Sequence, residues 1–179
     1  MTSHDNFDKA RTLGKLQEFF SLLRWKSTEL LSLYEVTKLL KPSIETYRGI
    51  MPIPVDKIIG SEGRYHDFTL AFYPRKDMLR TRWQSIDEAL HRQIILPPIS
   101  VFKLGDHYFV RDGHHRVSVA RMQKVEFIDA EVVELDSKIE LEPGLTRKQL
   151  VKRVVAYEGD SFFEEYNFPF ADREILNFT

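Results

Sequence analysis

Hydrophobic positions recur at helical spacing in the first forty residues. Between residues 7 and 24 they are Phe7, Leu13, Leu16, Phe19, Phe20 and Leu23. Ser27-Thr28 interrupts the pattern, and a shorter helix through Leu33, Val36, Leu39 and Leu40 is expected to end before Pro42. We therefore predict an N-terminal helical arm over residues 1–49, whose apolar stripes serve as core or as a dimer seam.

After residue 49 the pattern mixes strands with helices. The expected elements are a strand near 55–59, a helix over 76–91, a hairpin of 99–104 with 108–110, a helix over 113–123 and a strand over 127–135. Residues 137–179 are predicted to form a C-terminal tail. It has one basic helix, TRKQLVKRVVAYE, followed by an aromatic segment, SFFEEYNFPFADREILNF. The pattern therefore predicts a core over residues 50–136 that mixes strands with helices.

Length and composition suit a cytoplasmic globular protein. The chain has 179 residues, of which 42% are hydrophobic and 30% charged. No apolar run approaches the roughly 18 residues of a membrane span, and the N-terminus lacks an apolar signal core. The chain has no cysteine, which excludes disulfides and thiol chemistry. A net charge of −1 gives no overall attraction to nucleic acid.

The stretch VRDGHHRVSVARM, residues 110–122, carries the clearest candidate chemistry. A strand ends, Asp112-Gly113 turns the chain, and a helix begins. The first N–H groups of a helix lack internal partners and its dipole makes this end electropositive, so it binds anions such as phosphate. Gly113 allows close approach of a ligand, and His114, His115 and Arg116 can donate to phosphate oxygens. The alternative is a plain turn in which the Asp112 carboxylate caps the helix.

A structural metal site is not expected here. Adjacent residues on a helix point about 100° apart, so the two histidines cannot readily chelate one ion. A Mg²⁺ ion that arrives with a nucleotide and is held partly by Asp112 fits the residues better.

The order strand, hairpin, DGHHRVSVA helix and strand, over roughly residues 52–135, resembles the core of the ParB/sulfiredoxin superfamily. This resemblance implies an α+β fold, with a small mixed sheet and packed helices. The corresponding box is a Gly-x-Arg-Arg helix start that binds nucleotide phosphates in ParB proteins and a Gly-Cys-His-Arg turn in sulfiredoxin. In the free-serine kinases of this fold it is similar to Asp-Gly-His-His-Arg. The chain looks closest to small ParB-like nuclease domain proteins with an N-terminal helical arm.

The departures from the family narrow the expected activity. Sulfiredoxin chemistry needs the absent cysteine. Only residues 136–179 follow the core, which puts the helix-turn-helix domain of ParB proteins in doubt. The kinases use an acidic catalytic residue near the nucleotide, and Glu62 and Asp67 are the nearest candidates by loop position.

A second loop, GSEGRYHDF, residues 60–68, is expected from the resemblance to face the DGHHR segment at residues 112–116. Gly60, Ser61, Gly63 and Arg64 would then contact the ligand. His66 or Asp67 could handle a proton or a metal-bound water. The alternative is a surface turn in which Gly60 and Gly63 take positive φ angles and Arg64 is solvated.

Arg80, Arg82 and Trp83 form a candidate nucleic-acid face on the helix RTRWQSIDEALH. The alternative is a core tryptophan with solvated arginines.

We weigh three functions. The leading hypothesis is a nucleotide-binding protein that hydrolyses or transfers a phosphoryl group, with His114 nearest the reacting phosphate, or that acts as a nucleotide switch closing a homodimer. The second is a DNA-associated nuclease or regulator. The third is an interaction module without a ligand.

Overall fold

The computed structural model describes residues 3–24, 29–40, 42, 44–136 and 147–165. The elements follow in the order α1 (Ser3–Arg24), β1 (Leu31–Ser32), α2 (Leu33–Leu40), β2 (Glu45–Pro54), β3 (Ile58–Ser61), α3 (Arg80–His91), β4 (Ile99–Leu104), β5 (His107–Asp112), α4 (His114–Met122), β6 (Phe127–Leu135) and α5 (Arg147–Glu165). Short 3₁₀ turns precede β3 and α3.

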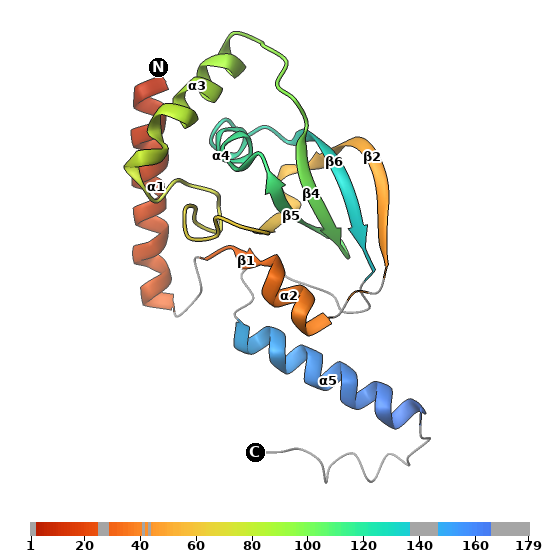
Figure 1. Ribbon diagram of the computed structural model, residues 1–179. Helices are drawn as coiled ribbons and strands as arrows, with labels where there is room; N and C mark the ends of the chain where they lie inside the picture. The colour runs from red at the N-terminus through yellow and green to blue at the C-terminus, as the bar shows by residue number, and fades with distance from the viewer. Residues whose placement is uncertain (1–2, 25–28, 41, 43, 137–146, 166–179) are drawn as a thin grey trace.

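The strands form one mixed sheet in the order β1-β3-β5-β4-β6-β2 (Figure 1). The β2–β6 and β4–β5 pairs are antiparallel, whereas β4–β6, β3–β5 and β1–β3 are parallel. This arrangement confirms the predicted α+β fold with a small mixed sheet and packed helices.

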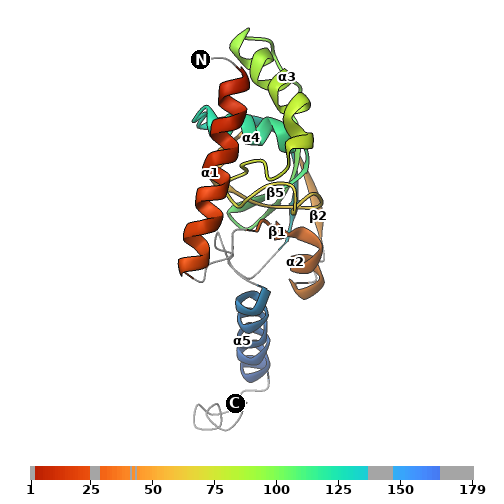
Figure 2. The same ribbon diagram turned by 90° about the vertical axis from the view of Figure 1, so that its left-hand side faces the viewer.

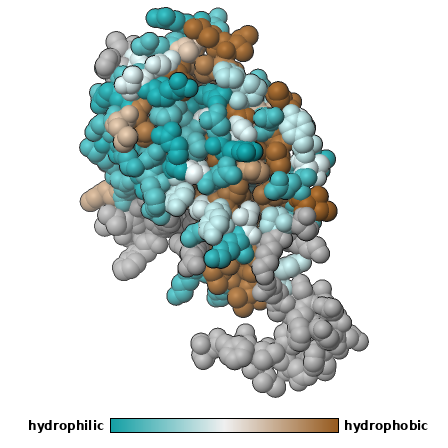
Figure 3. Space-filling view, in the orientation of Figure 1, coloured by the Kyte–Doolittle hydropathy of each residue, from teal (hydrophilic) through white to brown (hydrophobic). Residues whose placement is uncertain are grey.

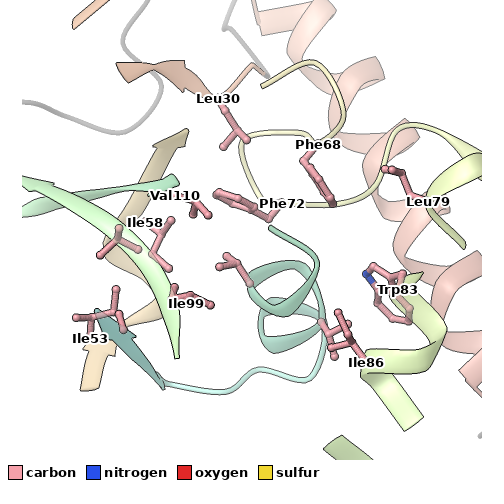
Figure 4. Close-up of a cluster of buried hydrophobic side chains, with 14 of the residues drawn as sticks. Leu30, Ile53, Ile58, Phe68, Phe72, Leu79, Trp83, Ile86, Ile99 and Val110 are labelled. Atoms are coloured by element: carbon pink, nitrogen blue, oxygen red, sulfur yellow. The ribbon is translucent and has the colours of Figure 1, made fainter. Parts of the chain in front are cut away.

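Each face of the sheet has its own hydrophobic cluster, because side chains along a strand alternate between faces. Val101 and Val110 belong to the cluster packed by α1, α3 and α4, which also holds Trp83 (Figure 4). Phe102 and Phe109, one position along each strand, belong to the cluster packed by α2 and α5. Figure 2 shows α3 and α4 toward one end of the molecule, α1 running along its side, and α5 extending beyond α2 at the other end. The site described below lies on the α3–α4 side.

The sequence pattern located most of these elements. The expected helices over 7–24, 76–91 and 113–123, the hairpin and the strand over 127–135 are all present. The strand expected near 55–59 is present but begins later: residues 55–57 form a 3₁₀ turn and β3 begins at Ile58. Strand β2 was missed because Gly49, Pro52 and Pro54 interrupt its pattern. It lies at the edge of the sheet, where alternate N–H groups need no partner strand and proline is tolerated.

Helix α1 is part of the main core. Phe7 is fully buried against Trp83 with ring centroids 5.6 Å apart, and the Asn6 amide donates to the buried Asp87 carboxylate at 3.0 Å. The predicted boundary between arm and core, at residues 49 and 50, falls inside β2. Leu16, Phe19 and Phe20 on the second half of α1 are exposed, and the expected homodimer stays a prediction.

Two further expectations concern the tail and membranes. Of the predicted tail, the structure describes part of the basic helix, as α5, while residues 137–146 and 166–179 lie outside the described residues. Among the described helices, none combines the length and the apolar character that crossing a membrane requires.

Candidate anion-binding site at the start of helix α4

The turn between β5 and α4 depends on Gly113. This residue has φ +102°, in the left-handed region that favours glycine. A Cβ atom here would lie 2.4 Å from Cγ2 of Ile99, so the neighbouring strand leaves no room for one. The glycine therefore lets the chain reverse tightly and start α4 close against β4.

The first turn of α4 has no side-chain cap. Gly113 is the N-cap residue and Asp112 does not cap the helix, contrary to the alternative considered from the sequence. The Asp112 carboxylate instead accepts a hydrogen bond of 2.6 Å from Nη2 of Arg116. The N–H groups that open the helix are thus left without a side-chain acceptor, which favours an anion at this end.

His114 is buried between the second loop and the core. Its Nε2 lies 2.6 Å from Oγ of Ser61, and its ring stacks on Phe68. The Ser61 hydroxyl has the carbonyls of Gly63 and Val110 as acceptors, so the network favours a proton on His114 Nε2. Burial, and then the charge of Arg64, lower the pKa of His114 to about 4, so the imidazole is neutral at pH 7.

His115 is a second neutral imidazole beside it. Burial, followed by the charges of Arg64 and Arg82, lowers the pKa of His115 to about 4. Its Nε2 lies 3.5 Å from Nη1 of Arg64, and only the imidazole can accept in that pair. The proton therefore resides on Nδ1, which is buried and has no hydrogen-bond partner among the described residues.

Arginine side chains surround this helix start. Arg64 donates from Nε to Asp67 at 2.9 Å, Nε of Arg111 lies 3.6 Å from Glu62, and Arg116 pairs with Asp112. Arg82, on α3, forms no ion pair within the part of the chain that the structure describes. One guanidinium is thus left without a carboxylate partner.

These groups line one pocket of about 380 Å³, which we call the α4 pocket. Its lining residues are Glu62, Gly63, Arg64, Arg82, Ile86, Arg111, Asp112, Gly113, His114, His115 and Arg116. Four guanidinium groups face two carboxylates while both histidines are neutral, so the pocket carries a surplus of positive charge. The structure therefore brings together the DGHHR turn, part of the second loop and Arg82.

Several predicted residues have other roles. Ser61 stands behind His114 rather than in the pocket wall, and Asp67 holds Arg64 and Lys76. Burial raises the pKa of Asp67, but hydrogen bonds from Lys76 and Arg64 outweigh it and the pKa is lowered. Asp67 therefore holds two cationic side chains in place, and its catalytic role stays a prediction.

The backbone angles of the two glycines in the second loop differ from those of the surface turn considered as the alternative. Neither Gly60 nor Gly63 has a positive φ angle; Arg64 does, at 57°. Gly60 is required for packing, because a Cβ there would lie 2.2 Å from the Phe109 ring. The left-handed conformation of Arg64 belongs to the loop that forms one wall of the α4 pocket.

The candidate nucleic-acid face on α3 is not formed as expected. Trp83 is completely buried and donates from Nε1 to Oγ of Ser118 at 2.8 Å, so it is a core residue. Arg80 pairs with Asp8 and Asp77 and lies over the Phe7 ring. Of the three, Arg82 lines the same pocket as the DGHHR turn.

Arg111 is the site residue that the sequence analysis missed. It directly precedes the turn, and its guanidinium lies 5.6 Å from the centroid of the Phe102 ring. The register of β4 against β5 shifts at this residue, between the Val110 and Asp112 pairs, so strand alternation provided no signal for its side. In the described residues, no cluster of three or more histidine and carboxylate side chains is arranged to hold a metal.

The fold and site define a mixed α+β domain with an electropositive pocket at a strand–helix turn. The family model described as the ParB N-terminal domain matches residues 53–147, just over half of the chain. The chain belongs to this family, which confirms the predicted resemblance. Sulfiredoxin from Arabidopsis thaliana is similar at 18% identity with a TM-score of 0.31, over 46% of this chain and 82% of that one. No curated protein matches the chain.

Proposed function

We propose that this protein binds the phosphate groups of a nucleotide in the α4 pocket. The observation that carries the proposal is the pocket's combination of an uncapped helix start with a surplus of arginines. The opening N–H groups of α4 would bind phosphate oxygens through the backbone, and Arg82 and Arg111 would neutralise their charge.

Magnesium fits this site as an ion that arrives with the nucleotide. Glu62 and Asp112 are the carboxylates of the pocket, and the Asp112 side chain is 78% exposed. Oxygen ligands of this kind suit Mg²⁺ when phosphates supply the remaining ones. Glu62 and Asp112 would hold the ion, and its charge would offset that of the phosphates.

Phosphoryl hydrolysis or transfer would need little more from the protein than positioning and charge stabilisation. His114 would lie nearest the reacting phosphate, held in orientation by Ser61 and by the ring of Phe68. A nucleotide switch would use the same contacts without turnover, so nucleotide binding is the step to test first.

The test is thermal unfolding with ATP, ADP, CTP and GTP, each with and without Mg²⁺. A ligand that binds only the native state raises the unfolding midpoint. We expect at least one nucleotide to do so, and we expect Arg82→Ala to lose most of the shift. Arg82 is the suitable position because Arg116 also donates to the carbonyls of Pro97 and Pro98, so that replacing Arg116 would disturb the fold.

The matched control is Arg92→Ala, which removes an exposed arginine at the end of the same helix but outside the α4 pocket. It should keep the full shift. No shift with any nucleotide, or an equal shift in Arg82→Ala and wild type, would overturn the phosphate assignment. A parallel arm uses short duplex DNA at two salt concentrations. A salt-sensitive shift with DNA alone would make nucleic acid the ligand.

A further inference from the structure

An apolar groove adjoins the α4 pocket. It has a volume of about 290 Å³ and lies between the end of α3, the segment leading to β4, helix α4 and the start of β6. Its lining residues are Ile86, Leu90, Ile94, Ile95, Leu96, Pro97, Arg116, Val119, Ala120, Val125, Phe127, Ile128 and Asp129. Arg116 and Asp129 are the only charged residues among them, so the groove is suited to an uncharged group.

The groove and the α4 pocket share part of their walls. Ile86 and Arg116 line both. The Arg116 guanidinium is held by the carbonyls of Pro97 and Pro98 and by Asp112. These contacts fix it as a ridge between a charged compartment and an apolar one. A single ligand with an anionic part and an apolar part could therefore occupy both compartments across this ridge.

The groove leaves apolar surface exposed to water. Ile95 is 95% exposed, Phe127 is 56% exposed and Ile94 is 52% exposed. Figure 3 shows brown, apolar atoms at the top of the molecule, where α3 ends and the chain turns toward β4. Single exposed apolar residues are ordinary, but several that line one groove beside a charged pocket mark a binding surface.

We infer that this groove holds the base-bearing part of the nucleotide whose phosphates occupy the α4 pocket. The inference rests on the proposed function and adds the half of the ligand that the arginines do not recognise. The groove alone is at the lower limit of the usual size of a ligand pocket, whereas together with the α4 pocket it falls well within that range. Burying a flat base against Leu90, Ile95 and Phe127 would remove their apolar surface from water.

Asp129 gives the groove a preference among bases. It is the one carboxylate that lines the groove. A carboxylate accepts hydrogen bonds and repels other acceptors, so it would favour bases with an exocyclic amino group, such as adenine, cytosine or guanine. Uracil, which presents carbonyl oxygens at the equivalent edge, should bind less well.

The experiment is a calorimetric titration that compares inorganic tripolyphosphate with ATP, CTP, GTP and UTP. Tripolyphosphate probes the α4 pocket alone, whereas a nucleoside triphosphate probes both compartments. We expect at least one amino-bearing nucleotide to bind wild type about tenfold or more tightly than tripolyphosphate. The double variant Leu90→Asn, Ile95→Asn should lose that advantage and keep the tripolyphosphate affinity.

Met78→Asn is the matched control, because Met78 is 83% exposed but lines neither compartment. It should behave as wild type with every ligand. Equal affinity of wild type for tripolyphosphate and for all four nucleotides would overturn the inference and leave the phosphate site standing. Failure of every ligand, tripolyphosphate included, would overturn the proposed function as well.

The groove could instead be covered by a second copy of the chain. Sedimentation of wild type and the double variant separates that outcome. If the variant changes the oligomeric state while nucleotide affinity stays the same, the groove is a subunit interface and the inference is wrong.

Discussion

The two ends of helix α4 differ in what they offer a ligand. The N-terminal end begins at Gly113 without a side-chain cap and opens into the α4 pocket. The C-terminal end is closed by two hydrogen bonds, from the N–H of Lys124 to Arg121 at 3.1 Å and from the N–H of Val125 to Ala120 at 2.9 Å. This is the Schellman arrangement, which satisfies the last carbonyls of a helix.

A larger pocket, of about 580 Å³, lies at that closed end. Its arginine, Arg121, donates from Nη2 to the carbonyls of Val55 and Ile58, at 3.0 and 2.6 Å. The carboxylates of Asp56 and Glu126 also line it. The comparison teaches that volume alone does not mark the site: the smaller pocket has free helix N–H groups and a surplus of cations.

The largest expected effect comes from the two buried histidines. Both imidazoles have native pKa values near 4, against about 6.5 when unfolded. The unfolded state therefore binds more protons below pH 6.5, and the free energy of unfolding falls as the pH falls from about 6.5 to about 4. Each pH unit between the two pKa values corresponds to about 1.4 kcal/mol per histidine, so the total loss is several kcal/mol.

Urea unfolding from pH 8 to pH 4 measures this loss. The double variant His114→Asn, His115→Asn should give a much flatter dependence on pH, and His66→Gln, which removes an exposed ring, should keep the wild-type slope. A slope that is the same in wild type and the double variant would show that these histidines titrate as solvated groups.

The next effect tests the turn that opens α4. Gly113→Ala should lower the free energy of unfolding by about 3 kcal/mol, because the new Cβ meets Ile99 in a backbone region that disfavours side chains. Gly105→Ala is the control, since Gly105 also has a positive φ angle but open space around it. It should cost about 1 kcal/mol. Chemical denaturation measures the free energy of unfolding of both variants. Equal losses would mean that Ile99 on β4 moves aside for the new Cβ atom at Gly113.

The smallest effect concerns the closed end. Lys124 has φ 56°, at the position where helices usually end in glycine. Lys124→Gly should raise the free energy of unfolding by about 0.5–1 kcal/mol. It should leave the nucleotide response of the α4 pocket unchanged, as the same thermal assay can show. A reduced response would mean that the two ends of the helix do not act independently.

The fold was largely predictable because its core strands are regular. The strand over 127–135 has a plain apolar run, and the hairpin has apolar strands joined by a Gly-Asp turn. In β2, by contrast, one glycine and two prolines interrupt the strand pattern. The sequence favoured a buried Trp83 without excluding an exposed one, since a tryptophan beside two arginines suits both a core and a surface. Its partner Ser118 lies 35 residues away.

The site was predictable at its turn and less so at its periphery. Residues 112–116 are contiguous, and the resemblance placed Arg64 opposite them. The sequence could not show that Asp112 would pair with Arg116 rather than cap the helix, because both partners lie within one helical turn. Nor could it show that Arg82 would face the pocket while Arg80 pairs with α1, since this depends on how α1 packs on α3.

The most direct test of the N-terminal end as the binding site is a map of backbone amide signals. ¹H–¹⁵N spectra would be recorded during titration with ATP and Mg²⁺, and then with the nucleotide that gives the largest thermal shift. Phosphate binding at the start of α4 predicts saturable shifts at Gly113, His114, His115 and Arg116, with little change at Lys124 and Val125. Shifts confined to the closed end, or none at the opening turn with any nucleotide, would contradict it.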